Sequence, residues 1–512
     1  MLNNSSININ LYIEKENTID IISHIFKWNL IISPSFLQYF FSLEDKQQRT
    51  KLFILNLHKN YIREITFLGF NKEDLVSRTT IDKIIFLLKK IFKIVEKNNE
   101  KEKYIINDCH NIKNLSFEFQ KTVYLNDLFI ELSDVISLNI VESFFINGNS
   151  CNQFQFNNTI NFIANKMNSL KYLKINKFCS GINNIIPFKK IFSNINEHIE
   201  SIEINDIVSA SDLFSLLKLK IYPLKELKIH IFSKEKEIDW DFLEKYINTM
   251  ESLQIKLIVI NISKNIDKIL DIINKMKNIK NLTIIGGFDL SQLLNFQNYE
   301  KIENLNIDIN ITKENYEYSN DLSLNYFSNF KKLKILGVEK RASINSLNKF
   351  YIFIFPSTLT CINLINIDAY SLIILLITNK KYLSNIKELK IENVIFNYEE
   401  FDNLIAIFKD FKSLIKLSIN RIKLPKKYIG DDSIFNYIYF IFENIPSLME
   451  LDITNNKLIF DEYKYNKIKE YIPKTFLSLK ILSSNIPQEF FLSTFIDLKF
   501  IFNGKLDIIE DK

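Results

Sequence analysis

A short apolar pattern recurs along most of the chain, and this recurrence limits the folds that the chain can adopt. The pattern places apolar residues at its first, fourth and sixth positions, and its clearest copy is Leu448-Met-Glu-Leu451-Asp-Ile453. The central apolar residues of fourteen copies are Leu115, Phe144, Leu173, Ile202, Leu227, Ile258, Leu282, Leu305, Leu333, Ile362, Leu389, Leu417, Leu451 and Leu479. The thirteen steps between them run from 23 to 34 residues and average 28. Such a period indicates a repeat architecture.

Each repeat is expected to contain one strand and one helix. Alternation of apolar residues over three or four positions predicts a short strand. The segment after it is long enough for a helix, and the set Ile266, Ile269, Leu270 and Ile273 has the i, i+3, i+4, i+7 spacing of a helical face. One such unit is too small to bury its own apolar face, whereas stacked units share a continuous core. The sequence therefore predicts an α/β solenoid.

The repeat resembles a known family. The copy that starts at Leu448 continues to Asn456 and Leu458 and so matches L-x-x-L-x-L-x-x-N-x-L, the signature of leucine-rich repeats. The period is similar to that of the intracellular, helix-containing subclass, and the resemblance covers about residues 106 to 490. It implies a horseshoe with a parallel inner sheet and outer helices, built from about 14 units and a C-terminal cap over residues 106–512.

The asparagine of the family signature is missing from several repeats. Family members use this side chain to bond the backbone of the turn after the strand. It is present at Asn149, Asn310 and Asn456. Apolar residues stand at the equivalent place in other repeats, at Phe178, Ile207, Phe232, Val394 and Ile422. We expect those turns to satisfy their backbone groups in another way, because buried backbone groups are almost always paired.

Residues 1–105 lie mostly outside the repeat pattern, and we predict a mainly helical N-terminal cap. Ile19 to Leu43 is typical of two helices broken near Ser33-Pro34, and Ile81 to Val95 has helical periodicity. Two isolated copies of the pattern, Leu52 to Leu57 and Ile62 to Phe67, could form strands of a degenerate first unit. A cap would cover the otherwise exposed end of the stack.

An alternative interpretation of residues 17–45 is an F-box-like segment. Asp20 and the run from Ile21 to Phe26 resemble part of that motif. Its opening Leu-Pro is replaced by Asn17-Thr18, and its later V-C-x-x-W portion is missing. This resemblance implies a substrate receptor of a ubiquitin ligase, with the repeats reading the substrate.

No catalytic, cofactor or metal motif is found in the sequence. The 8 glycines form neither a dinucleotide fingerprint nor a Walker A loop. The 4 cysteines include no C-x-x-C pair, and the 5 histidines include no H-E-x-x-H. We therefore expect no enzymatic activity, no cofactor and no small-molecule substrate.

Charge and hydropathy narrow the partners and the compartment. The net charge is +5 over 512 residues, with lysine and glutamate locally alternating, so we expect no nucleic-acid partner. No run of about 18 apolar residues predicts a membrane span, and the N-terminus does not have the pattern of a signal peptide. With so few cysteines, the chain fits a reducing compartment. We expect a cytoplasmic protein, or a nuclear one.

The polar residues between the apolar positions of each strand are the candidate binding site. In the predicted array they lie on the concave face, and they carry both signs of charge, which suits a protein partner. The candidates are Lys174, Asn176, Glu203, Asn205, Lys228, His230, Asn306, Asp308, Lys390, Glu392, Ser418, Asn420, Asp452 and Thr454. We expect a non-catalytic interaction scaffold; regulation of a small GTPase is a further alternative, although the acidic tail of such repeat proteins is absent.

Overall fold

The computed structural model describes parts of both halves of the chain. The described residues are 28–57, 62–70, 78–92, 112–119, 126–133, 135–147, 163, 165–176, 199–209, 224–233, 238, 240–259, 262–288, 296–297, 299–310, 327, 330–341, 354–423, 433–453 and 478–480. The chain divides into two compact units, Met1–Asn261 and Ile262–Lys512.

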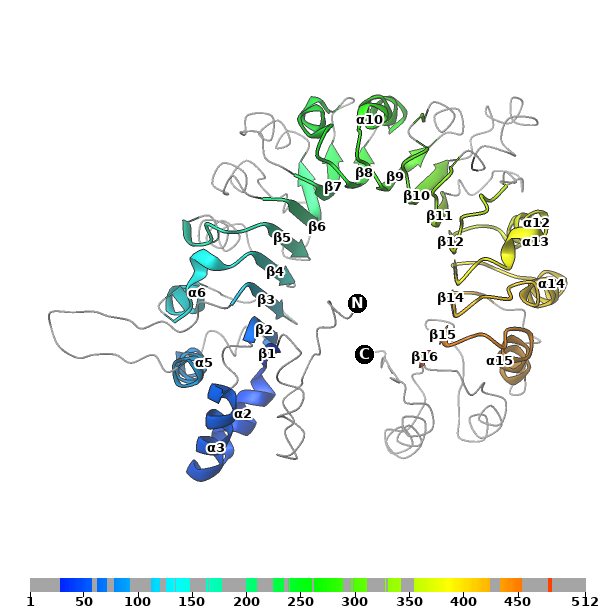
Figure 1. Ribbon diagram of the computed structural model, residues 1–512. Coiled ribbons are helices and arrows are strands. Elements are labelled where there is room, and N and C mark those ends of the chain that lie inside the picture. Colours follow the sequence, from blue (N-terminus) through cyan, green and yellow to red (C-terminus); the bar gives the residue numbers. More distant parts are fainter. Residues whose placement is uncertain are drawn as a thin grey trace. The chain divides into compact units, whose positions relative to one another are not determined.

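The first unit contains a parallel sheet in which each strand pairs with the next one along the chain (Figure 1). The strands are β1 Trp28–Ile32, β2 Ile62–Phe70, β3 Asn114–Phe119, β4 Ser143–Asn147, β5 Tyr172–Asn176, β6 Ser201–Ser209, β7 Glu226–Ser233 and β8 Ser252–Val259. The helices are α2 Pro34–Ser42, α3 Asp45–Leu57, α5 Arg78–Ile91 and α6 Asn126–Ser133, with 3-10 turns at Leu138–Ile140 and Asp241–Tyr246.

The second unit is built in the same way, with successive strands again pairing in parallel. The strands are β9 Asn281–Phe288, β10 Asn304–Asn310, β11 Ile335–Arg341, β12 Cys361–Ile365, β13 Glu388–Glu392, β14 Lys416–Asn420, β15 Glu450–Asp452 and β16 Ser478–Lys480. The helices are α10 Ile262–Lys275, α12 Ala369–Thr378, α13 Lys380–Leu383, α14 Tyr398–Phe408 and α15 Ser433–Asn444.

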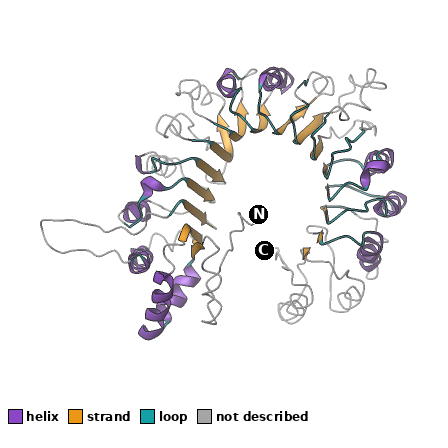
Figure 2. Cartoon of the chain, viewed as in Figure 1, coloured by secondary structure: helices purple, strands orange, loops and turns teal. Residues whose placement is uncertain are grey.

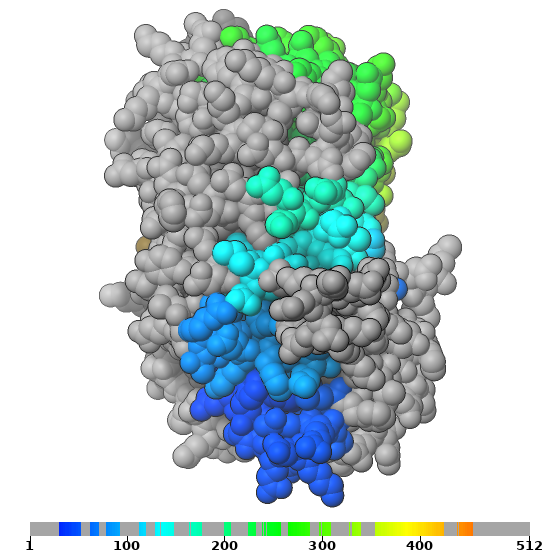
Figure 3. Space-filling model, turned by 90° about the vertical axis from the view of Figure 1, so that its left-hand side faces the viewer, coloured from blue at the N-terminus to red at the C-terminus, as the bar shows by residue number. Residues whose placement is uncertain are grey.

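Within each unit the helices cover one face of the sheet and form the outer layer (Figure 2). Alternate strand residues face this layer: in β5, Leu173 and Ile175 are buried, whereas Tyr172, Lys174 and Asn176 lie on the opposite face. Figure 3 shows the described segments of the first unit following one another across its surface, from the dark blue of α2 and α3 to the cyan of α6. The predicted α/β solenoid is confirmed.

Local sequence signals fix where several helices begin. The Ser33 side chain accepts a hydrogen bond from the Phe36 N–H at 3.1 Å, and Pro34 occupies the first turn of α2. In α14 the Asn397 side chain accepts from the Glu400 N–H at 2.9 Å, and the Glu400 carboxylate accepts from the Asn397 N–H at 2.8 Å. This reciprocal capping box satisfies two N–H groups that a helix start otherwise leaves unpaired.

The strand register confirms the repeat and corrects it at two places. Twelve of the fourteen predicted central residues occupy matching positions in paired strands. In β8, however, Leu253 and not Ile258 pairs with Leu227. In β11, Leu336 and not Leu333 pairs with Leu305. Both segments offer more than one apolar frame, so the pattern alone favoured the wrong one.

The sheet extends into the N-terminal region, where only helices and one degenerate unit were expected. Residues 28–32, predicted to be helical, form β1 and pair with β2. The copy Ile62 to Phe67 is a strand as predicted, because it lies in β2, but the copy Leu52 to Leu57 lies in helix α3. The helices predicted after Pro34 and from Ile81 are confirmed as α2 and α5.

The predicted boundary between cap and repeats does not coincide with an end of the sheet. Strand β2 pairs directly with β3 in parallel, although residue 105 lies between them. The F-box-like run from Ile21 to Phe26 lies outside the described residues, as does the C-terminal cap beyond residue 480. Within 17–45, the described part is a strand followed by α2.

Three turns that lack the family asparagine have a residue in the left-handed conformation directly before the signature position. Asn366, Asn393 and Arg421 have φ of 58°, 58° and 53° and follow directly after β12, β13 and β14. The Asn366 N–H donates to the Glu392 carbonyl at 2.9 Å, and the Asn393 N–H donates to the Asn420 carbonyl at 3.0 Å. Backbone bonds between neighbouring repeats therefore satisfy groups in the turns after β12 and β13.

The residue after each of these left-handed positions has an apolar side chain. Ile367, Val394 and Ile422 directly follow the left-handed residues, and all three are buried. The turns at Val394 and Ile422 satisfy backbone groups through bonds to each other, as in the bond from the Lys423 N–H to the Val394 carbonyl at 2.9 Å.

A cluster of phenylalanines fills the core under β2 to β4. Phe117 stacks on Phe67 with ring centroids 4.8 Å apart and meets Phe129 of α6 edge-on at 5.2 Å. Phe144 of β4 lies 5.7 Å from the Phe117 ring. All four side chains are buried. Because each ring comes from a different element, the cluster ties three strands to a helix.

Candidate interaction surface on the open face of the sheet

The open face of the sheet, opposite the helices, carries most of the predicted site residues. In the first unit, partly exposed candidates lie on β5, β6 and β7, namely Lys174, Asn176, Glu203, Asn205, Lys228 and His230. In the second unit, partly exposed candidates are Asn306, Lys390, Glu392 and Asp452. Asp308, Ser418 and Asn420 are buried, and Thr454 lies outside the described residues.

Glu203 stands at the centre of the candidate residues in the first unit. Its carboxylate lies 3.1 Å from Lys174 Nζ and 2.7 Å from Lys228 Nζ, and it accepts a hydrogen bond from Asn205 Nδ2 at 3.0 Å. Burial opposes its ionisation, but these donors outweigh burial, and the pKa of Glu203 lies below its usual value. The structure therefore joins four candidates from three strands, here called the Glu203 cluster.

Aromatic side chains border this cluster and were not among the predicted residues. Lys174 Nζ lies 5.2 Å from the centroid of the Phe145 ring, a cation–π contact. Tyr172 is 45% exposed on the same face. Phe145 directly follows a central apolar residue, as Lys174 does, but it is not polar, whereas Tyr172 precedes its central residue and all predicted candidates follow theirs.

His230 lies beside the cluster and is held neutral. Burial, followed by the positive charges of Lys256 and Lys228, lowers its pKa to about 4. Lys256 is its direct neighbour in the register of β7 and β8. The sequence prediction missed Lys256, because the frame shifted to Ile258 placed this lysine off the open face.

The lowered pKa of His230 predicts a pH-dependent stability. The folded pKa lies below the unfolded value of 6.5, so the unfolded state takes up the proton first as pH falls. Stability is thus full above pH 6.5 and declines toward pH 4. For this half-buried group we expect wild type to lose about 1 kcal/mol more than His230→Gln between pH 7 and pH 5. Urea unfolding at pH 7, 6 and 5 measures this, and parallel curves for the two proteins would contradict it.

Asp308 is a structural residue, which corrects its assignment to the accessible face. It is 0% exposed, and its Oδ1 accepts a hydrogen bond from the Gly286 N–H at 2.6 Å. The β9–β10 register shifts between Ile307 and Ile309. This irregularity lets Asp308 reach the backbone of the neighbouring strand, an interaction that alternation in the sequence does not reveal.

Ser418 and Asn420 are also largely hidden from solvent. Asn420 Nδ2 donates to Ser418 Oγ at 3.0 Å, which keeps both side chains close to β14. On the neighbouring strand, the Glu392 carboxylate lies 2.6 Å from Lys390 Nζ and 3.5 Å from a guanidinium nitrogen of Arg421. Lys390, Glu392 and Arg421 therefore contribute accessible charges to this part of the face, as do the exposed Glu388 and Lys416.

The open face of β9 to β11 has uncharged amides. Asn304 Nδ2 donates to Asn281 Oδ1, and Asn306 Nδ2 donates to Thr283 Oγ1 at 3.3 Å. The Asn306 side chain lies across Gly337 of β11, where a Cβ would be 1.9 Å from its Oδ1. Gly337 is therefore required for this close approach.

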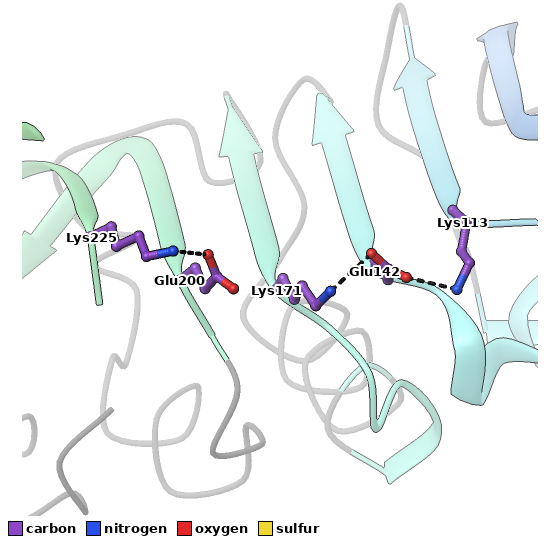
Figure 4. Close-up of polar contacts among 5 residues, drawn as sticks. All are labelled: Lys113, Glu142, Lys171, Glu200 and Lys225. Atoms are coloured by element: carbon purple, nitrogen blue, oxygen red, sulfur yellow. Dashed lines mark hydrogen bonds and ion pairs between the residues drawn. The ribbon is translucent and has the colours of Figure 1, made fainter. Parts of the chain in front are cut away.

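A row of alternating charges runs along one edge of the first sheet (Figure 4). The residues directly before β3, β4, β5, β6 and β7 form this rim ladder, namely Lys113, Glu142, Lys171, Glu200 and Lys225. The Glu142 carboxylate lies 2.7 Å from Lys113 Nζ and 3.2 Å from Lys171 Nζ. Glu200 lies 2.7 Å from Lys225 Nζ. The hydrogen bond from Lys113 is the main cause that lowers the pKa of Glu142.

The described residues offer little to a metal ion or a nucleophilic reaction. Within the described ranges, no group of three or more His, Cys, Asp or Glu side chains is arranged to hold a metal. Cys361 is buried, and burial together with nearby Glu388 raises its pKa to about 11, so the thiol stays protonated at neutral pH. None of the described helices has the length and apolar character needed to cross a membrane.

Comparison with known proteins gives matches in structure but not in sequence. No protein-family model and no curated protein matches the chain. The crystal structure of the TLR13–ssRNA13 complex is 12% identical, with a TM-score of 0.31, over 84% of this chain and 67% of that one. An LRR protein of Leptospira interrogans is 12% identical, with a TM-score of 0.27, over 81% of this chain and 94% of that one.

The strand pairing, and not these distant matches, identifies the fold. The chain is a leucine-rich-repeat-like α/β solenoid. Its apolar signature positions pair in register from strand to strand, and the described helices lie on the opposite side from the open face. At TM-scores below 0.5, the two solved structures indicate nothing about what this chain binds.

Proposed function

We propose that the chain is a non-catalytic scaffold that binds a protein partner on the open face of the sheet in its first unit. The Glu203 cluster carries this proposal, because it places both signs of charge beside Phe145 and the exposed Tyr172. Aromatic residues supply much of the binding energy in protein interfaces, and the surrounding polar residues set specificity. The resemblance of the repeat period to the intracellular subclass supports a cytoplasmic or nuclear location.

Alternation of charge argues for a protein partner over a polyanion. Lys174 and Lys228 both contact Glu203, so their charges are partly balanced before any ligand arrives. Binding to a nucleic-acid backbone draws on several uncompensated cations. A protein surface of mixed charge, with an apolar residue opposite Tyr172, fits this face better.

A double substitution tests this assignment. Tyr172→Ala with Lys174→Ala removes the exposed aromatic ring and one lysine, and leaves Lys228 paired with Glu203. We expect the recovery of specific lysate proteins on the immobilised full chain to fall about tenfold. Quantitative mass spectrometry of the bound proteins, after nuclease treatment, measures this loss.

The matched control removes the same residue types from the helical side of the second unit. Tyr370 is 58% exposed on α12, and Lys381 lies over the Tyr382 ring. Tyr370→Ala with Lys381→Ala should leave the recovered proteins unchanged. Equal loss in both variants, or loss in the control alone, would overturn the assignment to the open face.

The two regulatory alternatives stay predictions from the sequence. Residues 28–32 form strand β1, so an F-box-like adaptor would depend on residues 17–27. These residues lie outside the described part of the chain. Regulation of a small GTPase requires a partner whose identity the open face does not reveal.

A further inference from the structure

The open face of the first unit ends, at β7 and β8, in a group of basic residues. Lys228 and His230 lie two residues apart on β7, so both point to the open face. Lys256 of β8 is the register neighbour of His230, and Gln254 is that of Lys228. Three basic side chains therefore meet at one corner, here called the β7–β8 corner.

In the described part of the first unit, carboxylates balance the positive charges at this corner only in part. Glu203 of β6 pairs with Lys228 and also with Lys174. Among the described residues, no carboxylate forms an ion pair with Lys256. The groups that act on His230 are the charges of Lys256, Lys228 and Glu203, together with the backbone of Asn205, which hydrogen-bonds to the ring.

The hydrogen bond to Asn205 determines what the imidazole offers a ligand. This bond favours the protonated ring but is outweighed by burial and the two lysines, which lower the pKa of His230, and it is the effect expected when a ring N–H donates to a backbone carbonyl. A neutral imidazole has one N–H, so its other nitrogen is an acceptor. That nitrogen becomes a donor only when the ring takes up a proton.

We propose that the partner presents an acidic segment to the β7–β8 corner, with a carboxylate between Lys256 and His230, and that this carboxylate binds together with a proton taken up by the imidazole. The inference rests on the proposed function and specifies its partner. The incoming negative charge offsets the two lysines that keep His230 neutral. Acidic segments therefore bind more tightly as pH falls from 7 toward 5.5.

A peptide selection tests the chemistry of the partner. A random 12-residue library displayed on phage, with Asp, Glu, Lys and Arg equally represented, is selected on the full chain at pH 6. We expect the enriched peptides to share Asp or Glu at a fixed position. Enriched peptides without acidic residues, or the absence of any enrichment, would overturn the inference.

Variants of the corner then locate the bound carboxylate. Lys256→Gln should weaken the selected peptides about fivefold, whereas Lys331→Gln, which removes an equally positive but exposed side chain in the second unit, should not. In wild type, affinity should rise between pH 7 and pH 6, and His230→Gln should abolish that rise. Unchanged affinity in Lys256→Gln, or a pH response that survives His230→Gln, would contradict the proposal.

Two further outcomes separate the competing explanations. If oligouridine RNA binds more tightly than the selected peptides, and Lys256→Gln weakens it in the same way, the partner at this corner is a nucleic acid and not an acidic segment. If the Tyr172→Ala and Lys174→Ala variant loses lysate proteins but the selected peptides contain no acidic residues, this inference is wrong and the proposed function is retained. If the double variant recovers the same lysate proteins as wild type, the proposed function itself is wrong.

Discussion

Leu417→Asp should destabilise the second unit by several kcal/mol and lower its urea midpoint accordingly. Leu417 is 0% exposed in β14, where it pairs in register with Leu389 and Leu451. The new carboxylate would lie among apolar side chains, and burying an unpaired charge is among the most costly single changes. Circular dichroism and hydrogen exchange of β13 to β15 both report the loss.

A nearby surface position provides the control for this substitution. Ser413 is exposed shortly before the same strand, so Ser413→Asp introduces the same charge into solvent. We expect its effect to stay within about 0.5 kcal/mol. If Leu417→Asp unfolded at the same urea concentration as Ser413→Asp, the register of β14 would be wrong.

Phe117→Ala should cost the first unit about 3–5 kcal/mol. The ring is fully buried, stacks on Phe67 and meets Phe129 edge-on, so its removal leaves a cavity that rigid neighbouring rings fill poorly. Because repeats are stabilised by their neighbours, exchange should accelerate first in β2, β3 and β4. Hydrogen exchange with mass spectrometry resolves these strands.

Phe145→Ala is the matched aromatic control. Phe145 lies on the open face of the neighbouring strand β4 and is partly exposed beneath Lys174. Its loss should cost about 1 kcal/mol or less. A comparable loss of stability from both substitutions would mean that the Phe117 cluster is no more tightly packed than the open face.

The sequence predicted the solenoid because one period persists through irregular repeats. Individual copies are ambiguous where isoleucine and leucine are abundant, as the two shifted frames in β8 and β11 demonstrate. In β8, Leu253, Ile255 and Leu257 are all buried, so several frames satisfy the apolar pattern equally well. Pairing with neighbouring strands decides between them, and pairing is not visible in one repeat alone.

The N-terminal strands were harder to predict for a related reason. The segment Trp28–Ile32 is only five residues long, and its pairing with β2 supplies what local propensity does not. Leu52 to Leu57 satisfies the repeat pattern within α3, where no strand forms. Short apolar runs of this kind do not distinguish strand from helix.

The candidate site was predictable in its plan but not in its details. Alternation placed Lys174, Glu203 and Lys228 on one face, and the structure brings them together. Alternation could not predict that the Asp308 carboxylate accepts a hydrogen bond from the Gly286 N–H, since this contact depends on an irregular register. Lys256 was missed because an error of five residues in one frame changes which side chains face outward.

The rim ladder has a consequence for how such a chain can gain or lose repeats. Removing the segment from Glu142 to Leu170 would set Lys171 directly beside Lys113, two like charges in place of an attractive pair. Removing two repeats, up to Ile199, would bring Glu200 beside Lys113 and keep the alternation. Exposed ion pairs of this kind add little stability, but the sign of the charge alternates with every repeat and therefore recurs every two repeats. A change of one repeat in this part of the chain therefore creates a like-charge contact in the rim ladder, whereas a change of two repeats does not.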